Sequence, residues 1–297
     1  MDFSDFTDVR EIVSGWSGDE KYHVRSGEGR ELMLRLSPAD RYEHRKADFD
    51  RMTLAAMQDV PVPQPVDIGR FEDGRVYTLE EWVEGVSAEE RLPQVITRMR
   101  YFYGLHAGSM LRLIHTIPAP EGTPDWSETY SAKIDRVLKA YADCSLKYER
   151  GNAFVRYVLI NRHLVKDRPL CCQHGDFHTG NLLIEPDGRL RIIDFDRSGW
   201  GDPWEEFNRM HFSARTSALF ASGLVDGYFG GEEIPAVFWR LLALYEAVTM
   251  LGSLPWAMAY GQAEIDTMTE LADYVLDWHR EMRSPKPSWY THEFGRT

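Results

Sequence analysis

The chain has 297 residues, of which 43% are hydrophobic and 27% are charged, and its formal net charge is −13. This length and composition are typical of a soluble globular enzyme with one large or two smaller domains. The acidic balance disfavours nucleic acid as a partner, because binding to its phosphates requires clustered basic residues. We also expect no membrane partner, because no run approaches the roughly 20 apolar residues of a membrane span.

The three cysteines do not suggest a disulfide framework. Cys171 and Cys172 are adjacent, so their side chains would alternate across a strand and could not pair comfortably. The N-terminal segment "MDFSDFTDVR" lacks the basic and apolar regions of a secretory signal. These observations predict a reducing, cytoplasmic location. The sequence leaves the oligomeric state open.

The first 85 residues predict a small β-rich lobe. Five short alternating or apolar runs are bounded by turn residues and predict antiparallel strands at 9–15, 20–25, 31–36, 66–70 and 75–81. Helical spacing over 39–58 ends at the proline-rich segment "VPVPQP". The segment "VEG" that follows the last strand predicts a hinge.

The rest of the chain predicts a larger helical lobe. Long amphipathic runs indicate helices at 94–116, 127–147, 151–165, 204–230, 235–261 and 263–283. Between them, the apolar runs "LLI" and "LRIID" are joined by the turn "EPDG" and predict a hairpin over 182–194. We therefore expect an α+β chain with a five-stranded antiparallel sheet lobe (1–85) and a helical lobe (86–297).

Polar residues gather at the ends of the strands that flank this hairpin. The stretch "CCQHGDFHTGNLLI" contains Asp176 and Asn181, and "LRIIDFDRSGWGD" contains Asp194. Phosphoryl transfer from a nucleotide needs an oriented hydroxyl and a divalent metal held against the phosphates. An aspartate can accept the hydroxyl proton, and asparagine and aspartate oxygens are ligands that Mg²⁺ prefers. The spacing H-x-D-x-x-x-x-N, followed by a strand that ends in Asp, is that of a kinase catalytic loop.

The segments "HGDFHTGNLLI" and "IIDFD" resemble the aminoglycoside phosphotransferase and choline kinase-like family of small-molecule kinases. The segments "LRLIHTIP", "GWGDPWEEF" and "LEEWVEG" resemble other parts of that family in the same order. The resemblance implies a bilobal, protein-kinase-like fold and a phosphotransferase that uses ATP or GTP with Mg²⁺. It also implies that Asp176 is the catalytic base, that Asn181 and Asp194 hold Mg²⁺, and that His174 braces the catalytic loop.

The resemblance also implies a nucleotide site in the first lobe. The segment "VSGWSGDEKYHV", with Ser14, Gly15 and Gly18, lies where the family has its phosphate-covering loop. Glycines there let backbone N–H groups approach phosphate oxygens. Protein kinases hold the phosphates with a lysine on the third strand. This chain has Arg35 instead, whose guanidinium can also clamp a phosphate.

Two further parts of the nucleotide site follow from the same resemblance. Arg35 is expected to pair with an acid on the following helix, and the register favours Asp48 over Glu43 without deciding between them. At the hinge, the carbonyl group of Glu81 and the N–H group of Val83 are expected to bind adenine.

The acceptor is expected to be a small, cationic, hydroxylated molecule in the helical lobe. Acids available to bind ammonium groups include Asp196, Asp202, Glu205, Glu206, Glu246 and Asp266. An aminoglycoside-type antibiotic is the leading acceptor, which would make the protein a determinant of antibiotic resistance. Kinases of choline, homoserine, fructosamine or methylthioribose share the catalytic residues and remain alternatives, because fold does not settle substrate.

Two other function classes fit the sequence less well. A two-metal phosphohydrolase needs several clustered His and Asp ligands, and the ten histidines are scattered along the chain. A nucleotide-binding pseudokinase is suggested only by the arginine at position 35. The intact catalytic loop favours an active enzyme instead.

Overall fold

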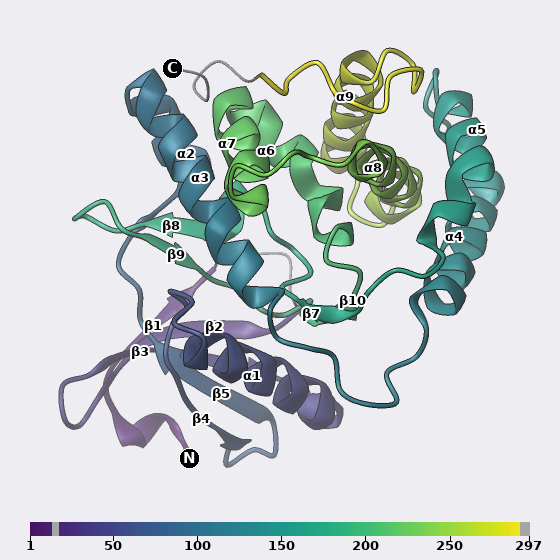
Figure 1. The fold of residues 1–297 in the computed structure, drawn as a ribbon. Helices are drawn as coiled ribbons and strands as arrows, with labels where there is room; N and C mark the ends of the chain where they lie inside the picture. Colours follow the sequence, from purple (N-terminus) through teal and green to yellow (C-terminus); the bar gives the residue numbers. More distant parts are fainter. Residues whose placement is uncertain (14–17, 292–297) are drawn as a thin grey trace.

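The computed structural model of the chain describes residues 1–13 and 18–291. Its first part is a five-stranded antiparallel sheet in the order β1–β2–β3–β5–β4, with helix α1 packed on β4 and β5 (Figure 1). The elements are β1 (Phe6–Ile12), β2 (Glu20–Ser26), β3 (Glu31–Ser37), α1 (Tyr42–Met57), β4 (Pro65–Arg70) and β5 (Val76–Glu81). The expected α+β fold with a five-stranded antiparallel sheet is thereby confirmed.

Strand β3 shows why the sheet has two different faces. Leu32, Leu34 and Leu36 are buried in the hydrophobic core of this lobe, as the alternation of side chains along a strand requires. The intervening Arg35 and Ser37 therefore lie on the opposite face, toward α1. The sequence pattern thus places one buried arginine on the side of the sheet that faces the rest of the molecule.

The chain leaves this sheet between Glu81 and Val86. The next strand, β6 (Val86–Ser87), pairs with β8 in a separate three-stranded sheet of order β6–β8–β9. On this change of partner we base the proposal of two lobes, 1–85 and 86–297.

The second part of the chain is mainly helical. Its helices are α2 (Ala88–Arg91), α3 (Thr97–Ile114), α4 (Trp126–Asp143), α5 (Asn152–Asn161), α6 (Met210–Thr216), α7 (Ala218–Phe229), α8 (Ala236–Ala257) and α9 (Gln262–Trp278). Its remaining short strands are β7 (Cys171–Gln173), β8 (Leu182–Ile184), β9 (Leu190–Ile192) and β10 (Gly199–Gly201). The single helix expected over 204–230 is wrong. Ser217 adopts an extended backbone and its side chain caps α7, so the helical segment is divided there.

Helices α3 and α7 run side by side at unusually close range (Figure 1). A Cβ atom added at Gly104 would lie 2.1 Å from the carbonyl oxygen of Phe220, and one at Gly108 would lie 2.1 Å from that of Leu224. On the facing helix, Gly223 would meet the Tyr101 carbonyl oxygen at 2.2 Å. The spacing of four residues between small side chains lets the two backbones touch.

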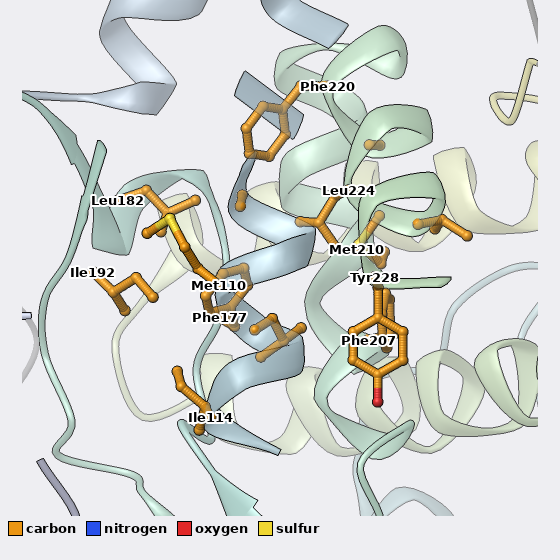
Figure 2. Packing of buried hydrophobic residues seen from close by; sticks show 14 of the residues in the cluster. Met110, Ile114, Phe177, Leu182, Ile192, Phe207, Met210, Phe220, Leu224 and Tyr228 are labelled. Carbon is orange, nitrogen blue, oxygen red and sulfur yellow. The ribbon is translucent and has the colours of Figure 1, made fainter. Parts of the chain in front are cut away.

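The hydrophobic core next to this helix pair holds the β8–β9 hairpin in place. Met110 of α3 and Leu224 and Tyr228 of α7 belong to one buried cluster with Leu182 and Ile192 of the hairpin (Figure 2). The hairpin strands have only three residues each. Their position therefore depends on this packing as well as on their own backbone hydrogen bonds.

By length and composition alone, helix α8 could span a membrane. This property was not predicted from the sequence. In the structure, 72% of its most apolar window is buried inside the protein, and Leu241, Leu244 and Leu251 are fully buried. The packing of a core helix accounts for this composition.

Candidate active site

The loop after β7 is fixed by the side chain of His174. Its Nε2 atom lies 2.9 Å from the carbonyl oxygen of Ile193, and its Nδ1 atom lies 3.2 Å from the backbone nitrogen of Asp176. Because that backbone N–H group can only donate, Nδ1 accepts, and Nε2 carries the proton that is donated to Ile193. His174 is therefore neutral and joins the loop to the residue that precedes Asp194.

Gly175 has no room for a side chain. Its backbone is left-handed, with φ at 84°, and an added Cβ atom would lie 1.9 Å from the carbonyl oxygen of Arg197. The backbone N–H groups of His174 and Gly175 donate to the two carboxylate oxygens of Glu206, each at 2.8 Å. Glu206 is 1% exposed, so it fixes the course of the loop from within the core.

The carboxylate of Asp176 lies next to two arginine side chains and His178. Oδ1 lies 3.0 Å from Nε of Arg209, and Oδ2 lies 3.7 Å from Nε of Arg197 and 3.9 Å from Nε2 of His178. Burial raises the pKa of Asp176, but the charges of Arg209 and Arg197 outweigh it, and the pKa is lower than usual. The carboxylate is therefore ionised at neutral pH and can accept a proton.

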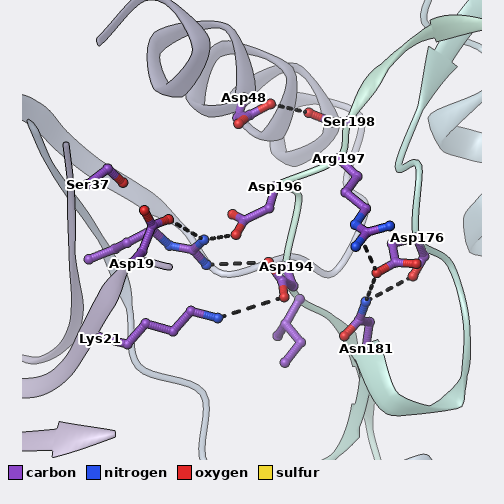
Figure 3. A network of polar contacts seen from close by, with 12 residues as sticks. Asp19, Lys21, Ser37, Asp48, Asp176, Asn181, Asp194, Asp196, Arg197 and Ser198 are labelled. Atoms are coloured by element: carbon purple, nitrogen blue, oxygen red, sulfur yellow. Dashed lines mark hydrogen bonds and ion pairs between the residues drawn. The ribbon is translucent and has the colours of Figure 1, made fainter. Parts of the chain in front are cut away.

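The hairpin brings Asn181 next to Asp194. The carbonyl oxygen of Asn181 accepts a hydrogen bond from the backbone of Ile193 at 3.0 Å. The Asn181 side chain donates through Nδ2 to the carbonyl oxygen of Asp176 at 2.9 Å (Figure 3). The amide oxygen of Asn181 therefore points away from Asp176 and is available to a ligand.

Asp194 adopts a left-handed backbone conformation, with φ at 68°. Burial raises the pKa of its carboxyl group, but Arg35 and Lys21 lower it further than burial raises it. An ionised carboxylate and an amide oxygen are a suitable pair of hard donors for Mg²⁺. Among the described residues, no three His, Cys, Asp or Glu side chains form a metal cluster. Mg²⁺ does not require one, because phosphates and water complete its coordination.

Arg35 is buried among the acids Asp19, Asp194 and Asp196. Figure 3 shows how these three acids lie relative to one another. The guanidinium forms ion pairs with Asp196, with Asp194 at 3.4 Å and with Asp19 at 3.5 Å. The expectation that Arg35 pairs with Asp48 or Glu43 is wrong, since neither is a partner among the described residues.

The two helix acids have other surroundings. Asp48 pairs with Arg51 at 2.8 Å and Arg45 at 3.2 Å, and accepts a hydrogen bond from Ser198 at 3.1 Å. Glu43 is exposed on α1. The hydrogen bond from Ser198 ties α1 to the segment that follows Asp194. Asp48 does not pair with Arg35, because Arg45 and Arg51 of its own helix already bind its carboxylate.

A cavity of about 860 Å³ opens beside Asp176. The ionisable side chains along its wall are the acids Glu89, Asp176, Glu205 and Glu264, the bases Lys133, Arg136, Arg197, Arg209 and Arg215, and His178. Glu205 is thus placed on this wall, where it pairs with Lys133 at 2.8 Å. The wall carries charges of both signs.

The structure moves Asp196, Asp202 and Glu246 away from this cavity, and Asp266 is exposed outside it. Asp196 lies beside Arg35 and Arg45. Asp202 has no exposed surface and binds Arg168 at 2.7 Å and the Tyr245 hydroxyl at 2.6 Å.

Glu246 is the third of these acids, and it also has no exposed surface. It lies 3.1 Å from His279 and 3.8 Å from His211 inside the helical lobe. Asp202 and Glu246 are therefore corrected to structural residues, because a buried carboxylate takes the nearest internal partners.

The expected nucleotide loop is described only in part. Ser14 and Gly15 lie outside the described residues. Gly18 is exposed, and a Cβ atom there would meet nothing within 4 Å. Glu81 is the last residue of β5, and its side chain accepts from Arg191 at 2.7 Å. Val83 lies in the connection to β6.

Comparison with known proteins assigns the chain to a family. Residues 8–238 match the model of the phosphotransferase enzyme family. The chain belongs to this family. The predicted resemblance is thereby confirmed, and the protein is a phosphotransferase.

A relative of this phosphotransferase agrees with the assignment. An aminoglycoside 3'-phosphotransferase of Niallia circulans is 24% identical over 236 residues, which are 77% of this chain and 83% of the relative.

Solved structures share the fold. A thermostable mutant of aminoglycoside phosphotransferase APH(4)-Ia, in ternary complex with ADP and hygromycin B, has a TM-score of 0.66 at 18% identity, covering 95% of this chain and 96% of that one. A choline/ethanolamine kinase family protein from Mesorhizobium loti has a TM-score of 0.67 at 20% identity, covering 95% and 92%.

From the sequence, Arg209 and His178 of this phosphotransferase had no assigned site role, and Glu206 was expected to bind the acceptor. Glu206 lies within the segment "GWGDPWEEF", which resembles a family motif, and Arg209 follows that segment by two residues. His178 lies within the stretch that resembles the catalytic loop. Burial lowers its pKa to about 4, and its Nδ1 accepts from the backbone of Gly180 at 3.0 Å. A neutral Nε2–H group therefore faces Asp176.

Replacement of Arg209 by methionine is expected to move the acidic limb of kcat/KM to higher pH by about one to two units. The substitution removes the charge that lowers the pKa of Asp176 most, so the carboxylate protonates at higher pH and the loss of activity is greatest in acid. The pH profile of kcat/KM measures this shift. Arg209→Lys keeps the charge and should retain a limb near that of the wild type. An unmoved limb in Arg209→Met would contradict the assignment.

Proposed function

We propose that this phosphotransferase transfers the γ-phosphoryl group of ATP or GTP to a hydroxyl group of a small molecule in the 860 Å³ cavity. The observation that carries the proposal is the position of the ionised Asp176, between that cavity and the oxygen donors of Asn181 and Asp194. Related folds have been solved with ADP or AMP-PNP, which supports a nucleotide as donor.

In this proposal Asp176 is the catalytic base. Its carboxylate faces the cavity and accepts the proton of the incoming hydroxyl group. Arg209 and Arg197 keep it ionised, and His174 fixes the loop that carries it. The protein supplies position and charge, which are the main requirements of phosphoryl transfer.

The nucleotide would lie on the other side of Asp176. Asn181 and Asp194 would hold Mg²⁺, which when bound neutralises charge on the phosphates. The loop that contains Gly18 would cover those phosphates, and the Glu81 carbonyl and Val83 N–H groups would bind the base. The unpaired cysteines of the described residues suit a cytoplasmic enzyme.

For the acceptor, an aminoglycoside-type antibiotic is the first candidate, and antibiotic resistance would then be the biological outcome. It is supported by the family and by three acids on the cavity wall, Glu89, Glu205 and Glu264. A metabolite with an anionic group is the second candidate. It is supported by Arg197 and Arg209, which flank Asp176 on the same wall.

ADP release over a panel of acceptors tests this proposal. The panel contains aminoglycosides, choline-like alcohols, neutral sugars and hydroxy acids, each with Mg²⁺ and with ATP or GTP. Turnover with aminoglycosides would support the first candidate, and turnover confined to hydroxy acids or phosphorylated sugars would support the second. Nucleotide binding without ADP release on any acceptor would contradict phosphoryl transfer.

A further inference from the structure

Because Arg35 forms several ion pairs, few of its N–H groups remain to bind a nucleotide. Its side chain is 5% exposed and is shared among Asp19, Asp194 and Asp196. Arg45 also pairs with Asp19 and Asp196, so two guanidinium groups share these carboxylates. The guanidinium of Arg35 is already directed at three carboxylates, so a triphosphate would have to compete with them for its N–H groups.

A second cation lies next to Arg35 on the neighbouring strand. Lys21 of β2 pairs directly with Arg35 of β3 in the antiparallel register, so both side chains lie on the same face of the sheet. The Nζ atom of Lys21 is 3.9 Å from Oδ2 of Asp194, and the side chain is 13% exposed (Figure 3). This separation is too long for a hydrogen bond, so Asp194 does not take up the ammonium protons.

Two other features place Lys21 where phosphates would arrive. It follows Gly18 by three residues, so the segment expected to cover the phosphates also carries the lysine. The ammonium group of Lys21 lies beside Asp194, which is the expected metal ligand. A metal ion held between the Asp194 carboxylate and a phosphate would therefore bring that phosphate within reach of Lys21. A compact ammonium group with three rotatable donors suits the contact with phosphate oxygens.

We propose that Lys21, and not Arg35, is the cation that contacts the phosphates of the bound nucleotide. Arg35 is instead a positioning residue that holds the carboxylates of Asp19, Asp194 and Asp196 together. This inference rests on the proposed function, because it specifies how the enzyme binds the nucleotide that donates the phosphoryl group. It also reassigns the phosphate contact from the third strand of the sheet to the second.

The Lys21→Met variant tests this inference by equilibrium binding. The affinity for ATP with Mg²⁺ is expected to fall about 10- to 100-fold, the range for loss of a charged hydrogen bond. The affinity for adenosine, which has no phosphate, should change less than about twofold, because the substitution does not alter the contacts to the base. Lys46→Met is the matched control. It removes an equal charge from an exposed pair with Asp50 in the same lobe and should leave both affinities unchanged.

Arg35→Met separates the two cations. It should lower the melting temperature, because Asp194 loses its guanidinium partner and Asp19 and Asp196 keep only Arg45, whereas Lys21→Met should not. Lys21→Arg keeps the charge and should retain most of the affinity for ATP. This variant tests the role of the charge even if the Lys21→Met protein folds poorly.

Each outcome points to one conclusion. A wild-type protein that binds no nucleotide would overturn the proposed function itself. A wild-type protein that binds ATP, together with a Lys21→Met variant that binds it equally well, would overturn only the role of Lys21. Equal losses for ATP and adenosine would do the same, because they would show a structural effect.

Discussion

Replacement of Asp194 by alanine is expected to lower kcat by at least about 10³-fold and to remove the dependence of nucleotide affinity on Mg²⁺. The carboxylate is ionised and lies beside Asn181, so it is the charged member of the expected metal site. Without it, a metal ion would keep only a neutral amide oxygen from the protein. Titration of nucleotide with and without Mg²⁺, followed by single-turnover kinetics, measures both effects.

The backbone of Asp194 calls for a control. Its left-handed conformation disfavours alanine, so a loss of activity has to be separated from a loss of fold. Asp59 has a similar conformation, with φ at 58°, and is exposed at the end of α1. Asp59→Ala should therefore keep full activity at a similar cost in backbone strain. Asp194→Asn tolerates the conformation but lacks the charge, and it should be as inactive as Asp194→Ala. Retention of a tenth of the wild-type kcat by either Asp194 variant would contradict the metal assignment.

Replacement of Asp176 by asparagine is expected to lower kcat by about 10²- to 10⁴-fold, the usual effect of removing a general base. Nucleotide affinity should stay near that of the wild type. The backbone carbonyl that holds Asn181 is unchanged, and asparagine has nearly the shape of aspartate. The acceptor should also still bind, because the cavity wall keeps its other charges. Acceptor-dependent ADP release and equilibrium nucleotide binding measure the two quantities.

A matched control for this variant is Asp187→Asn. Asp187 lies in the turn of the β8–β9 hairpin, where it pairs with Arg189 on the surface, and its replacement should leave kcat unchanged. The two active-site variants then separate two functions. Asp194→Ala loses metal-dependent nucleotide binding, whereas Asp176→Asn loses mainly the chemical step. Near-normal turnover by Asp176→Asn would show that this loop does not perform base catalysis.

The parts of the site that lie close together in sequence were predictable. Asp176 and Asn181 are five residues apart in one loop, and Asp194 follows at the end of the paired strand, so local spacing alone brings them together. The five strands of the first lobe were also predictable, because their alternation is a local property.

Partners from distant segments were not predictable in this way. Arg35 meets Asp196 across 161 residues, and the chain offers 47 acids from which spacing cannot choose. Asp202 and Glu246 were assigned to the acceptor because a sequence does not show which acids are buried. Glu206 was expected at the acceptor for the same reason, whereas the two hydrogen bonds that it accepts hold the catalytic loop.

The contact between α3 and α7 limits how this protein can be varied by evolution or by engineering. Alanine at Gly108 would require the helices to separate by about 1 Å or more, since the added carbon would lie 2.1 Å from a carbonyl oxygen in a close-packed interior. The segment after α3 accepts a backbone hydrogen bond from Cys172 through Ile117 at 2.9 Å, so such a shift would reach β7 and the loop that begins at His174. A library of random variants selected for activity should therefore be depleted at these glycines as strongly as at the reacting groups, although none of them touches a substrate.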